Sequence, residues 1–364
     1  MSERQQAMRD FLRASGWGDA VVAPLPGDAS TRRYARLALN SRKAMLMDQP
    51  QGVEMPAAPP DATPAQRSAL GYNAVARLAG ADCARFVAVS DYLRGQGLAA
   101  PEIHAADCPN GFVILEDLGD ALFADVLAQG GGEQALYDAA VEVLAKIHAA
   151  DAPAVLAAGK PLFDYDSTAL VAETDLLTEW FLPLALGRAA TADEIAEHRG
   201  LWGAALAGIA GSRRVFVHRD YHAQNLLWLP ERDGIARVGL IDFQDAVAGS
   251  MAYDLVSLVE DARRDVSPGV AQAATTHYLA TMQAQGAPLD ETAFRREMAV
   301  MAAQRNAKIV GIFARLYKRD GKPRYLALLP RVWGHLERDL AHPALAELRA
   351  WYDRVIAKDK RAAP

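Results

Sequence analysis

The sequence predicts an α+β protein with two lobes, a small β-rich N-terminal lobe and a larger, mainly helical C-terminal lobe. Alternating apolar and polar residues dominate 21–48, whereas apolar residues at helical spacing dominate most of the chain after residue 120. The short segment 116–119 contains a glycine and makes a natural hinge. We therefore expect an N-terminal lobe at 1–115, a hinge at 116–119 and a C-terminal lobe at 120–364.

The N-terminal lobe is expected to begin with a short helix and to continue as a small antiparallel sheet. Met8, Phe11 and Leu12 lie at helical spacing within 3–15, and Gly16 ends the pattern. The elements predicted after it are strands in VVAPLPG, RRYARLAL and AMLMD, a Pro- and Ala-rich loop at 49–64, helices near 66–79 and 86–96, and a strand in FVILE.

The C-terminal lobe is expected to be helical around one embedded hairpin. Helices are predicted near 120–129, 132–149, 166–186 and 191–210, and over most of 251–356. Strands are predicted in RVFVH, NLLWL and IARVGLIDF, and the turn PERDG joins the last two. This hairpin would return the chain at residue 242 to the neighbourhood of residue 225.

Composition narrows the class of partner. The 364 residues include 39 Lys and Arg against 45 Asp and Glu, a net charge of −6, which argues against nucleic acid or an anionic membrane and favours a small molecule. Cys83 and Cys108 have neither metal-ligand nor disulfide-framework spacing, so buried thiols in a reducing cytoplasm are expected. With no apolar run of membrane-spanning length, we expect a cytoplasmic protein rather than a membrane-embedded one. From the sequence we infer no obligate protein partner.

One polar stretch, FVHRDYHAQNLLWL at 216–229, carries the chemistry. Its His218-Arg219-Asp220 is followed five positions after the aspartate by Asn225, and the next strand ends in Asp242. This spacing is typical of enzymes that transfer a phosphoryl group from ATP. Such transfer needs a carboxylate to orient the attacking hydroxyl, which we assign to Asp220. It also needs oxygen ligands for Mg²⁺, which we assign to Asn225 and Asp242.

Two residues are expected to support this site. We expect His218 to be a structural hydrogen-bonding residue. Asp254, in the run YDL, either lies at a helix N-terminus or is buried and orients the segment from His218 to Asn225, which we call the catalytic loop; we favour the second. Only QDAVAGSMA separates the DF pair from this run, which leaves no room for a phosphorylated activation loop and argues against a protein kinase.

Several segments resemble a known group of enzymes. The motif H-R-D-x-x-x-x-N resembles the aminoglycoside phosphotransferase and choline kinase group, and the resemblance implies a protein-kinase-like two-lobed fold that uses ATP and Mg²⁺. GDASTRRYARL, ILEDLGD, IDFQDAVAG and QRNAKIVGIFARLYKRDGKPRYL more narrowly resemble the anomeric N-acetylmuramate/N-acetylglucosamine kinases of bacterial peptidoglycan recycling. This implies an amino-sugar substrate phosphorylated on its C1 hydroxyl to a sugar 1-phosphate.

The nucleotide-binding residues depart from the usual kinase pattern. The predicted phosphate loop has one glycine, Gly27, before the hydroxyl residues Ser30 and Thr31, which would replace further glycines. The strand AMLMD lacks the expected phosphate-binding lysine. The candidates for that positive charge are Lys43 and, preferred, Arg32 and Arg33. For adenine we expect main-chain groups of the hinge, from Glu116 to Leu118.

A basic row provides the candidate substrate contacts. Arg305, Lys308 and Arg315 lie at near-helical spacing, and they either bind the lactyl carboxylate of N-acetylmuramate or form a solvated helix face. One alternative function is a kinase of another small alcohol, such as choline or an aminoglycoside. These cationic acceptors are disfavoured by the basic row. Another is a nucleotide-binding pseudokinase that acts as a regulator, which the intact Asp220, Asn225 and Asp242 argue against.

Overall fold

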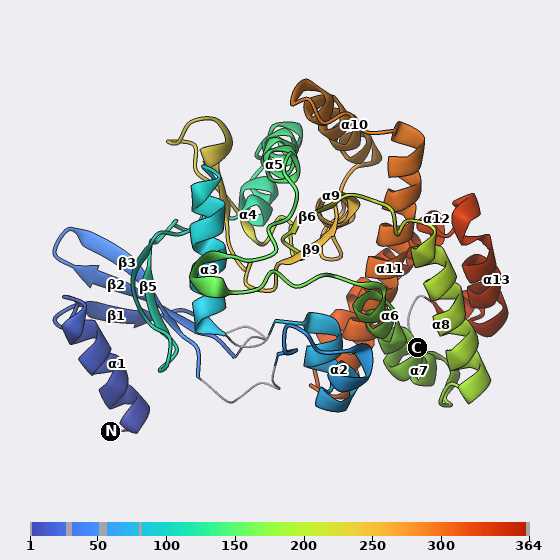
Figure 1. Ribbon diagram of the computed structural model, residues 1–364, viewed down its shortest axis with the longest axis horizontal. Helices are drawn as coiled ribbons and strands as arrows, with labels where there is room; N and C mark the ends of the chain where they lie inside the picture. The colour runs from blue at the N-terminus through green and yellow to red at the C-terminus, as the bar shows by residue number, and fades with distance from the viewer. Residues whose placement is uncertain (1, 27–30, 51–56, 80–81, 362–364) are drawn as a thin grey trace. The chain divides into compact units, whose positions relative to one another are not determined.

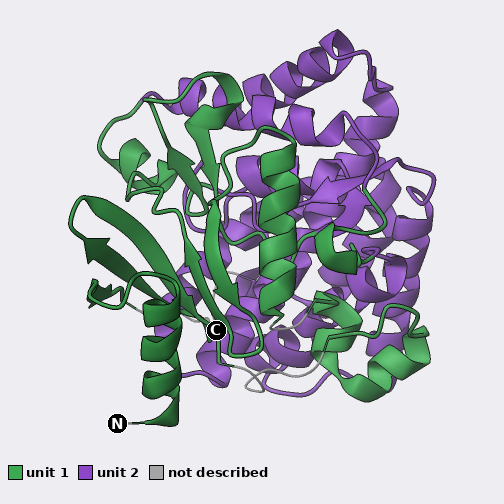
Figure 2. Cartoon of the chain, turned by 60° about the vertical axis from the view of Figure 1, so that its left-hand side comes forward, with its two compact units in different colours: residues 1–131, 153–163, 223–246 green, residues 132–152, 164–222, 247–364 purple. Residues whose placement is uncertain are grey.

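The chain forms two compact units, each assembled from segments that lie far apart in the sequence. The computed structural model describes residues 2–26, 31–50, 57–79 and 82–361. Unit 1 comprises 1–131, 153–163 and 223–246, and unit 2 comprises 132–152, 164–222 and 247–364 (Figure 2). The lobes expected from the sequence, 1–115 and 120–364, are each continuous in the chain, whereas the two units are not. The lobe boundaries therefore stay a prediction.

An antiparallel five-stranded sheet forms the centre of unit 1 (Figure 1). In spatial order its strands are β1 (Val21–Pro24), β2 (Arg33–Leu39), β3 (Arg42–Asp48), β5 (Phe112–Leu115) and β4 (Ile103–Asp107). Strands β1, β2, β3 and β5 confirm the four predicted ones. Strand β4 was not predicted, because it is an edge strand with no buried side chain and therefore carries no apolar alternation.

Helix α1 (Glu3–Ala14) packs on this sheet, as the leading apolar pattern predicted. Its N-terminus has a capping box, in which Ser2 and Gln5 satisfy each other's backbone amides. Phe11 and Leu12 are buried against strand residues that include Leu37 and Leu46. This packing buries one face of the sheet.

The remaining helical segments of unit 1 range from single turns to one longer helix, α3. They are α2 (Pro64–Leu70), a π-helical turn (Asn73–Arg77), α3 (Cys83–Gly95) and α4 (Phe123–Ala128), with 3₁₀ turns at Ala157–Gly159 and Gly234–Arg237. The single helix predicted at 66–79 is therefore wrong. The helix ends before Gly71, whose φ of 97° is incompatible with an α-helix, and the chain then forms the π-helical turn.

The predicted hairpin is present in unit 1 as β7 (Leu226–Trp228) and β8 (Val238–Leu240), which pair in antiparallel register. Leu226 faces Leu240, and the Ile241 amide donates a hydrogen bond to the Asn225 carbonyl oxygen at 3.2 Å. The residue after Ile241 is Asp242. The hairpin therefore brings the neighbourhoods of Asn225 and Asp242 together, as the sequence predicted.

Unit 2 is mainly helical. Its α-helices are α5 (Glu133–His148), α6 (Ser167–Leu176), α7 (Leu182–Leu186), α8 (Ala192–Ala207), α9 (Ala252–Val259), α10 (Pro268–Ala284), α11 (Glu291–Lys318), α12 (Leu329–Asp339) and α13 (Ala346–Val355). A π-helical turn lies at Leu177–Phe181, and 3₁₀ turns lie at Pro323–Leu328, Pro343–Leu345 and Lys358–Lys360. The α+β fold class is confirmed. Within the described ranges, no helix has both the length and the apolar character needed to cross a membrane.

One small sheet completes unit 2. Strand β6 (Arg214–Val217) pairs antiparallel with β9 (Val247–Ser250). Strand β6 was predicted, whereas β9 was not, since its sequence VAGS is too short and too rich in small residues to read as a strand. The catalytic loop follows β6 directly, so this two-stranded sheet sets where the loop begins.

A glycine controls how closely α11 approaches α6 in unit 2. A Cβ atom built on Gly311 would lie 2.5 Å from the Cβ and the carbonyl oxygen of Leu176, both atoms of the facing helix. Real side chains essentially never come so near, and backbone cannot move aside cheaply. Gly311 therefore permits the close packing that sets α11, with its Arg305 and Lys308, against α6.

Replacing Gly311 by Ala should destabilise the protein by about 1–3 kcal/mol through overpacking. The control is Gly200→Ala, at an exposed position of α8, where an added Cβ meets nothing within 4 Å. That change should stabilise the protein by about 0.5–1 kcal/mol, because alanine favours helix. Thermal unfolding of both variants measures this, and equal shifts of the same sign would contradict the packing argument.

Candidate active site

Unit 1 contains a pocket of about 470 Å³, within the range of about 300–1,000 Å³ typical of small-molecule sites. Its lining comes from the sheet, the hinge segment, α3 and the hairpin. Apolar lining residues include Met45, Phe86, Leu118, Leu122 and Ile241, and polar ones include Arg32, Asn225 and Asp242. A lining that combines apolar and polar side chains is suited to a flat base that carries phosphates.

The hinge segment beside this pocket is tied to the sheet by Arg36 on β2. The Arg36 Nε lies 2.9 Å from an Asp117 carboxylate oxygen, and its Nη2 lies 2.5 Å from one of Asp120. These two charge-assisted contacts raise the pKa of Arg36 and hold the segment in one conformation. Arg36 was not predicted from the sequence, since an arginine in a strand carries no motif.

The hydrogen-bonding groups of Glu116 and Leu118 in the hinge differ in whether they have partners within unit 1. The Glu116 amide donates to the Glu102 carbonyl oxygen at 2.8 Å, so it is used within the unit. The Glu116 carboxylate accepts a hydrogen bond from Arg232 at 2.5 Å. Across the described ranges we find no hydrogen bond from the Leu118 amide. The Leu118 amide is therefore more available to a ligand than the Glu116 amide.

Asp242 and Asn225 both line this pocket. The Asp242 Oδ1 accepts hydrogen bonds from Arg32 at 2.8 Å and from Gln244 at 3.0 Å. Asp242 has a φ of 62°, an uncommon conformation for a residue with a side chain, and such strain gathers at functional sites. An amide and a carboxylate that share a pocket suit Mg²⁺, which typically uses one or two protein carboxylates together with substrate phosphates.

The four predicted phosphate-binding residues are placed differently. Ser30 lies outside the described residues, and Thr31 directly precedes Arg32 in the chain. Arg32 lines the pocket and is only 10% exposed, whereas Arg33 is exposed and is not among the described lining residues. Side chains alternate along an extended strand, so Arg32 and Arg36 share a face and Arg33 points to the other. Lys43, the alternative candidate, is exposed on β3.

Unit 2 contains a second, smaller pocket that Asp220 lines. Arg219, Arg263, Arg305 and Lys308 also line it, together with apolar side chains of α11. Its volume of about 80 Å³ accommodates part of a ligand rather than a whole molecule. Four cations around one carboxylate make it suited to an acidic or neutral group.

The charges of this pocket keep Asp220 ionised. Burial opposes the charged form, but the positive charge of Lys308, with that of Arg219, outweighs burial and lowers the pKa of Asp220 to about 2. At neutral pH the carboxylate can therefore accept a hydrogen bond from a hydroxyl and orient it.

Asp254 holds the start of the catalytic loop. Its two carboxylate oxygens accept the backbone amides of His218 at 2.6 Å and Arg219 at 2.9 Å. Burial raises the pKa of Asp254 to about 7, while these two hydrogen bonds favour the charged form. His218 is fully buried, and its ring packs edge-on against Tyr221 at 5.7 Å. Both placements suit the supporting roles expected for His218 and Asp254.

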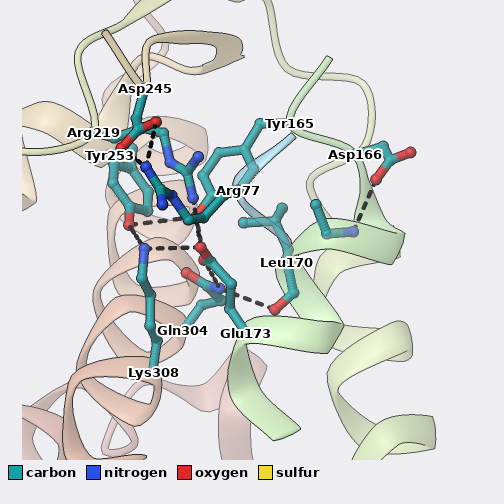
Figure 3. Close-up of polar contacts among 11 residues, drawn as sticks. Arg77, Tyr165, Asp166, Leu170, Glu173, Arg219, Asp245, Tyr253, Gln304 and Lys308 are labelled. Atoms are coloured by element: carbon teal, nitrogen blue, oxygen red, sulfur yellow. Dashed lines mark hydrogen bonds and ion pairs between the residues drawn. The ribbon is translucent and has the colours of Figure 1, made fainter. Parts of the chain in front are cut away.

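The basic row on α11 divides into two parts. Arg305 and Lys308 line the Asp220 pocket, and Arg315 is not among its described lining residues. Lys308 also contacts Glu173 at 2.8 Å (Figure 3). Glu173 on α6 was missed by the sequence reading, because one glutamate in a helical run carries no motif. Only its burial, 1% exposed, distinguishes it.

The strand-terminal carboxylate, the motif H-R-D-x-x-x-x-N and the apolar nucleotide-sized pocket define an enzyme that transfers a phosphoryl group. The chain belongs to the phosphotransferase enzyme family, whose model matches residues 21–289. It is 47% identical to the N-acetylmuramate/N-acetylglucosamine kinase of Caulobacter vibrioides, over 99% of each chain. It is 34% identical to the kinase of the same name from Pseudomonas aeruginosa, over 93% of this chain and 90% of that one.

A solved structure shows the same fold at lower identity. The crystal structure of choline kinase LicA from Streptococcus pneumoniae matches with a TM-score of 0.59 and 13% sequence identity, over 95% of this chain and 99% of that one. At this identity the likeness concerns the fold alone. It confirms the predicted protein-kinase-like fold class.

Proposed function

We propose that the protein is an ATP-dependent, Mg²⁺-requiring kinase that phosphorylates the anomeric hydroxyl of N-acetylmuramate, N-acetylglucosamine or both. The observation that carries this proposal is the 47% identity, over essentially the whole chain, to a kinase named for these two sugars. The segments GDASTRRYARL, ILEDLGD, IDFQDAVAG and QRNAKIVGIFARLYKRDGKPRYL support it, because they resemble segments of the same sugar kinases. We further propose that the enzyme acts in peptidoglycan recycling in the cytoplasm. We also propose that the chain has an N-terminal lobe at 1–115, a hinge at 116–119 and a C-terminal lobe at 120–364.

Unit 1 would bind the nucleotide. Adenine would lie against the apolar lining residues and use the Leu118 amide and the Glu116 carbonyl oxygen. Arg32, supported by Ser30 and Thr31, would face the phosphates, and Arg33 would play at most an indirect part from the opposite strand face. Mg²⁺, held by Asn225 and Asp242, would neutralise phosphate charge.

Unit 2 would bind the acceptor. Asp220 would accept the proton of the C1 hydroxyl as its oxygen bonds to the γ-phosphorus, while the bond from that phosphorus to the β,γ-bridging oxygen breaks and ADP leaves. The anomeric hydroxyl is more acidic than an ordinary alcohol, so its orientation matters more than the strength of the base. A carboxylate with a pKa of about 2 suits that role.

The basic residues of unit 2 would favour an anionic acceptor. Arg305 and Lys308 line the Asp220 pocket, so we propose that they bind the lactyl carboxylate of N-acetylmuramate. Arg315, seven residues after Lys308 on α11, would contribute long-range positive charge. Cationic acceptors such as choline or an aminoglycoside would be repelled by the same residues.

The deciding experiment measures ADP release with ATP and Mg²⁺ against N-acetylmuramate, N-acetylglucosamine, choline and an aminoglycoside, with phosphorus NMR of the product. We expect a sugar 1-phosphate signal from the amino sugars alone. Because screening weakens charge recognition, raising the salt concentration should raise KM for N-acetylmuramate and leave KM for N-acetylglucosamine nearly unchanged. ATP binding without ADP release from any acceptor would support a pseudokinase instead.

A further inference from the structure

Glu173 is a buried anion at the centre of a polar cluster in unit 2 (Figure 3). Its carboxylate contacts Arg219 at 2.6 Å and Lys308 at 2.8 Å, and it accepts hydrogen bonds from the Tyr165 hydroxyl and from Gln304 at 3.2 Å. These donors come from three segments of the chain besides α6: the segment before α6, the catalytic loop and α11. Glu173 therefore links the catalytic loop to the helix that carries the candidate substrate residues.

The electrostatics of the cluster require Glu173 to be charged. Burial alone would raise the pKa of Glu173, but the positive charges of Lys308 and Arg219 outweigh burial and lower it. A buried carboxylate is tolerated only when it is paired in this way. Glu173 in turn compensates the charges of two cations that line the pocket of Asp220. The Glu173 carboxylate lies between the Arg219 guanidinium and the Lys308 ammonium group and pairs with both.

Arg219 directly precedes Asp220, and it is held at both ends. Its backbone amide donates to Asp254, its guanidinium contacts Glu173, and that guanidinium also lies 4.6 Å from the centre of the Tyr165 ring. Its φ of 76° is uncommon for a residue with a side chain and persists only when the surroundings hold it. The orientation of the next residue, Asp220, depends on this conformation.

Lys308 is held by the same carboxylate. Its ammonium group lies 2.8 Å from Glu173 and 3.2 Å from the Tyr253 hydroxyl, and it provides the largest opposite-charge effect on Asp220. An unpaired lysine of this length would sample several rotamers. Contact with Glu173 restricts it to the position that lines the pocket of Asp220.

We infer that Glu173 is a positioning residue of the phosphotransferase reaction, which holds Arg219 and Lys308 so that Asp220 and the acceptor-binding charge keep their places. This inference rests on the proposed function, because it takes Asp220 as the residue that orients the hydroxyl. It assigns a role to a residue that is not among the described lining residues of either pocket.

The test is steady-state kinetics of Glu173→Gln with ATP and the amino sugars. We expect kcat to fall by up to about 100-fold, since misplacement of catalytic groups by about 1 Å has effects of this size. KM for ATP should stay within about twofold, because the residues that line the nucleotide pocket belong to unit 1. A variant with wild-type kcat would overturn the inference.

A second variant covers the case in which Glu173→Gln does not fold, since it leaves two buried cations without their anion. The double variant Glu173→Gln/Arg219→Gln removes one charge of each sign and preserves the balance. We expect its kcat to be as low as that of Arg219→Gln alone, because both changes break the same contact. If the double variant has wild-type kcat, Glu173 serves stability only and the inference fails.

The control is Glu297→Gln on α11, another buried glutamate of unit 2, which accepts a hydrogen bond from Ser250 and lies outside the Asp220 pocket. Its kcat should equal that of the wild type. The wild-type reaction separates the two failures. If the wild type releases no ADP with any acceptor, the proposed function is wrong and the inference about Glu173 is wrong with it. If the wild type is active and the Glu173 variants have the same kcat as the wild type, only the inference about Glu173 is wrong.

Discussion

Replacing Asp220 by Asn is expected to lower kcat by about 10²- to 10⁴-fold, the range for loss of a positioned general base. Asparagine has nearly the same shape, but it cannot accept the hydroxyl proton as a carboxylate does. The nucleotide pocket of unit 1 does not include Asp220 among its described lining residues, so the affinity for ATP should stay within about twofold.

Single-turnover kinetics and calorimetric titration with a non-hydrolysable ATP analogue measure these two effects separately. The matched control is Asp265→Asn, also in unit 2, whose side chain is 85% exposed and pairs with Arg331 at the surface. That variant should keep wild-type kcat. An Asp220→Asn variant with turnover near that of the wild type would refute the assignment of Asp220.

Replacing Asp242 by Asn is expected to lower kcat by about 10²- to 10⁴-fold, which corresponds to a loss of several kcal/mol of transition-state stabilisation. The amide keeps an oxygen at the same place but loses the negative charge that attracts Mg²⁺. The Mg²⁺ concentration that gives half-maximal rate should therefore rise as well. Loss of the Arg32 contact adds to the effect, because Arg32 pairs with this carboxylate at 2.8 Å.

Rates measured across a Mg²⁺ titration, with ATP held in excess, test the Asp242 prediction. Asp233→Asn is the control, since Asp233 is an exposed residue in the connection between the two strands of the same hairpin. Its Mg²⁺ dependence should match that of the wild type. If Asp242→Asn also requires no more Mg²⁺ than the wild type, Asp242 is not a metal ligand.

Local sequence patterns predicted the elements that carry the chemistry. The hairpin that begins at Asn225 and ends before Asp242 was predicted from two apolar runs and a turn, because strand pairing across a short turn is a local event. Strands β4 and β9 were missed, since an edge strand and a short strand of small residues are stabilised by partners distant in the sequence.

The sequence by itself determined the motif from His218 to Asn225 and the carboxylate of Asp242, since spacing along the chain is enough to specify them. Only the tertiary structure decided that Arg36 pairs with Asp117 and Asp120, and that Glu173 joins Arg219 to Lys308. The physical reason is that burial and ion pairing depend on which segments pack together. A charged residue in a helix or a strand carries no local sign of the partner it will meet.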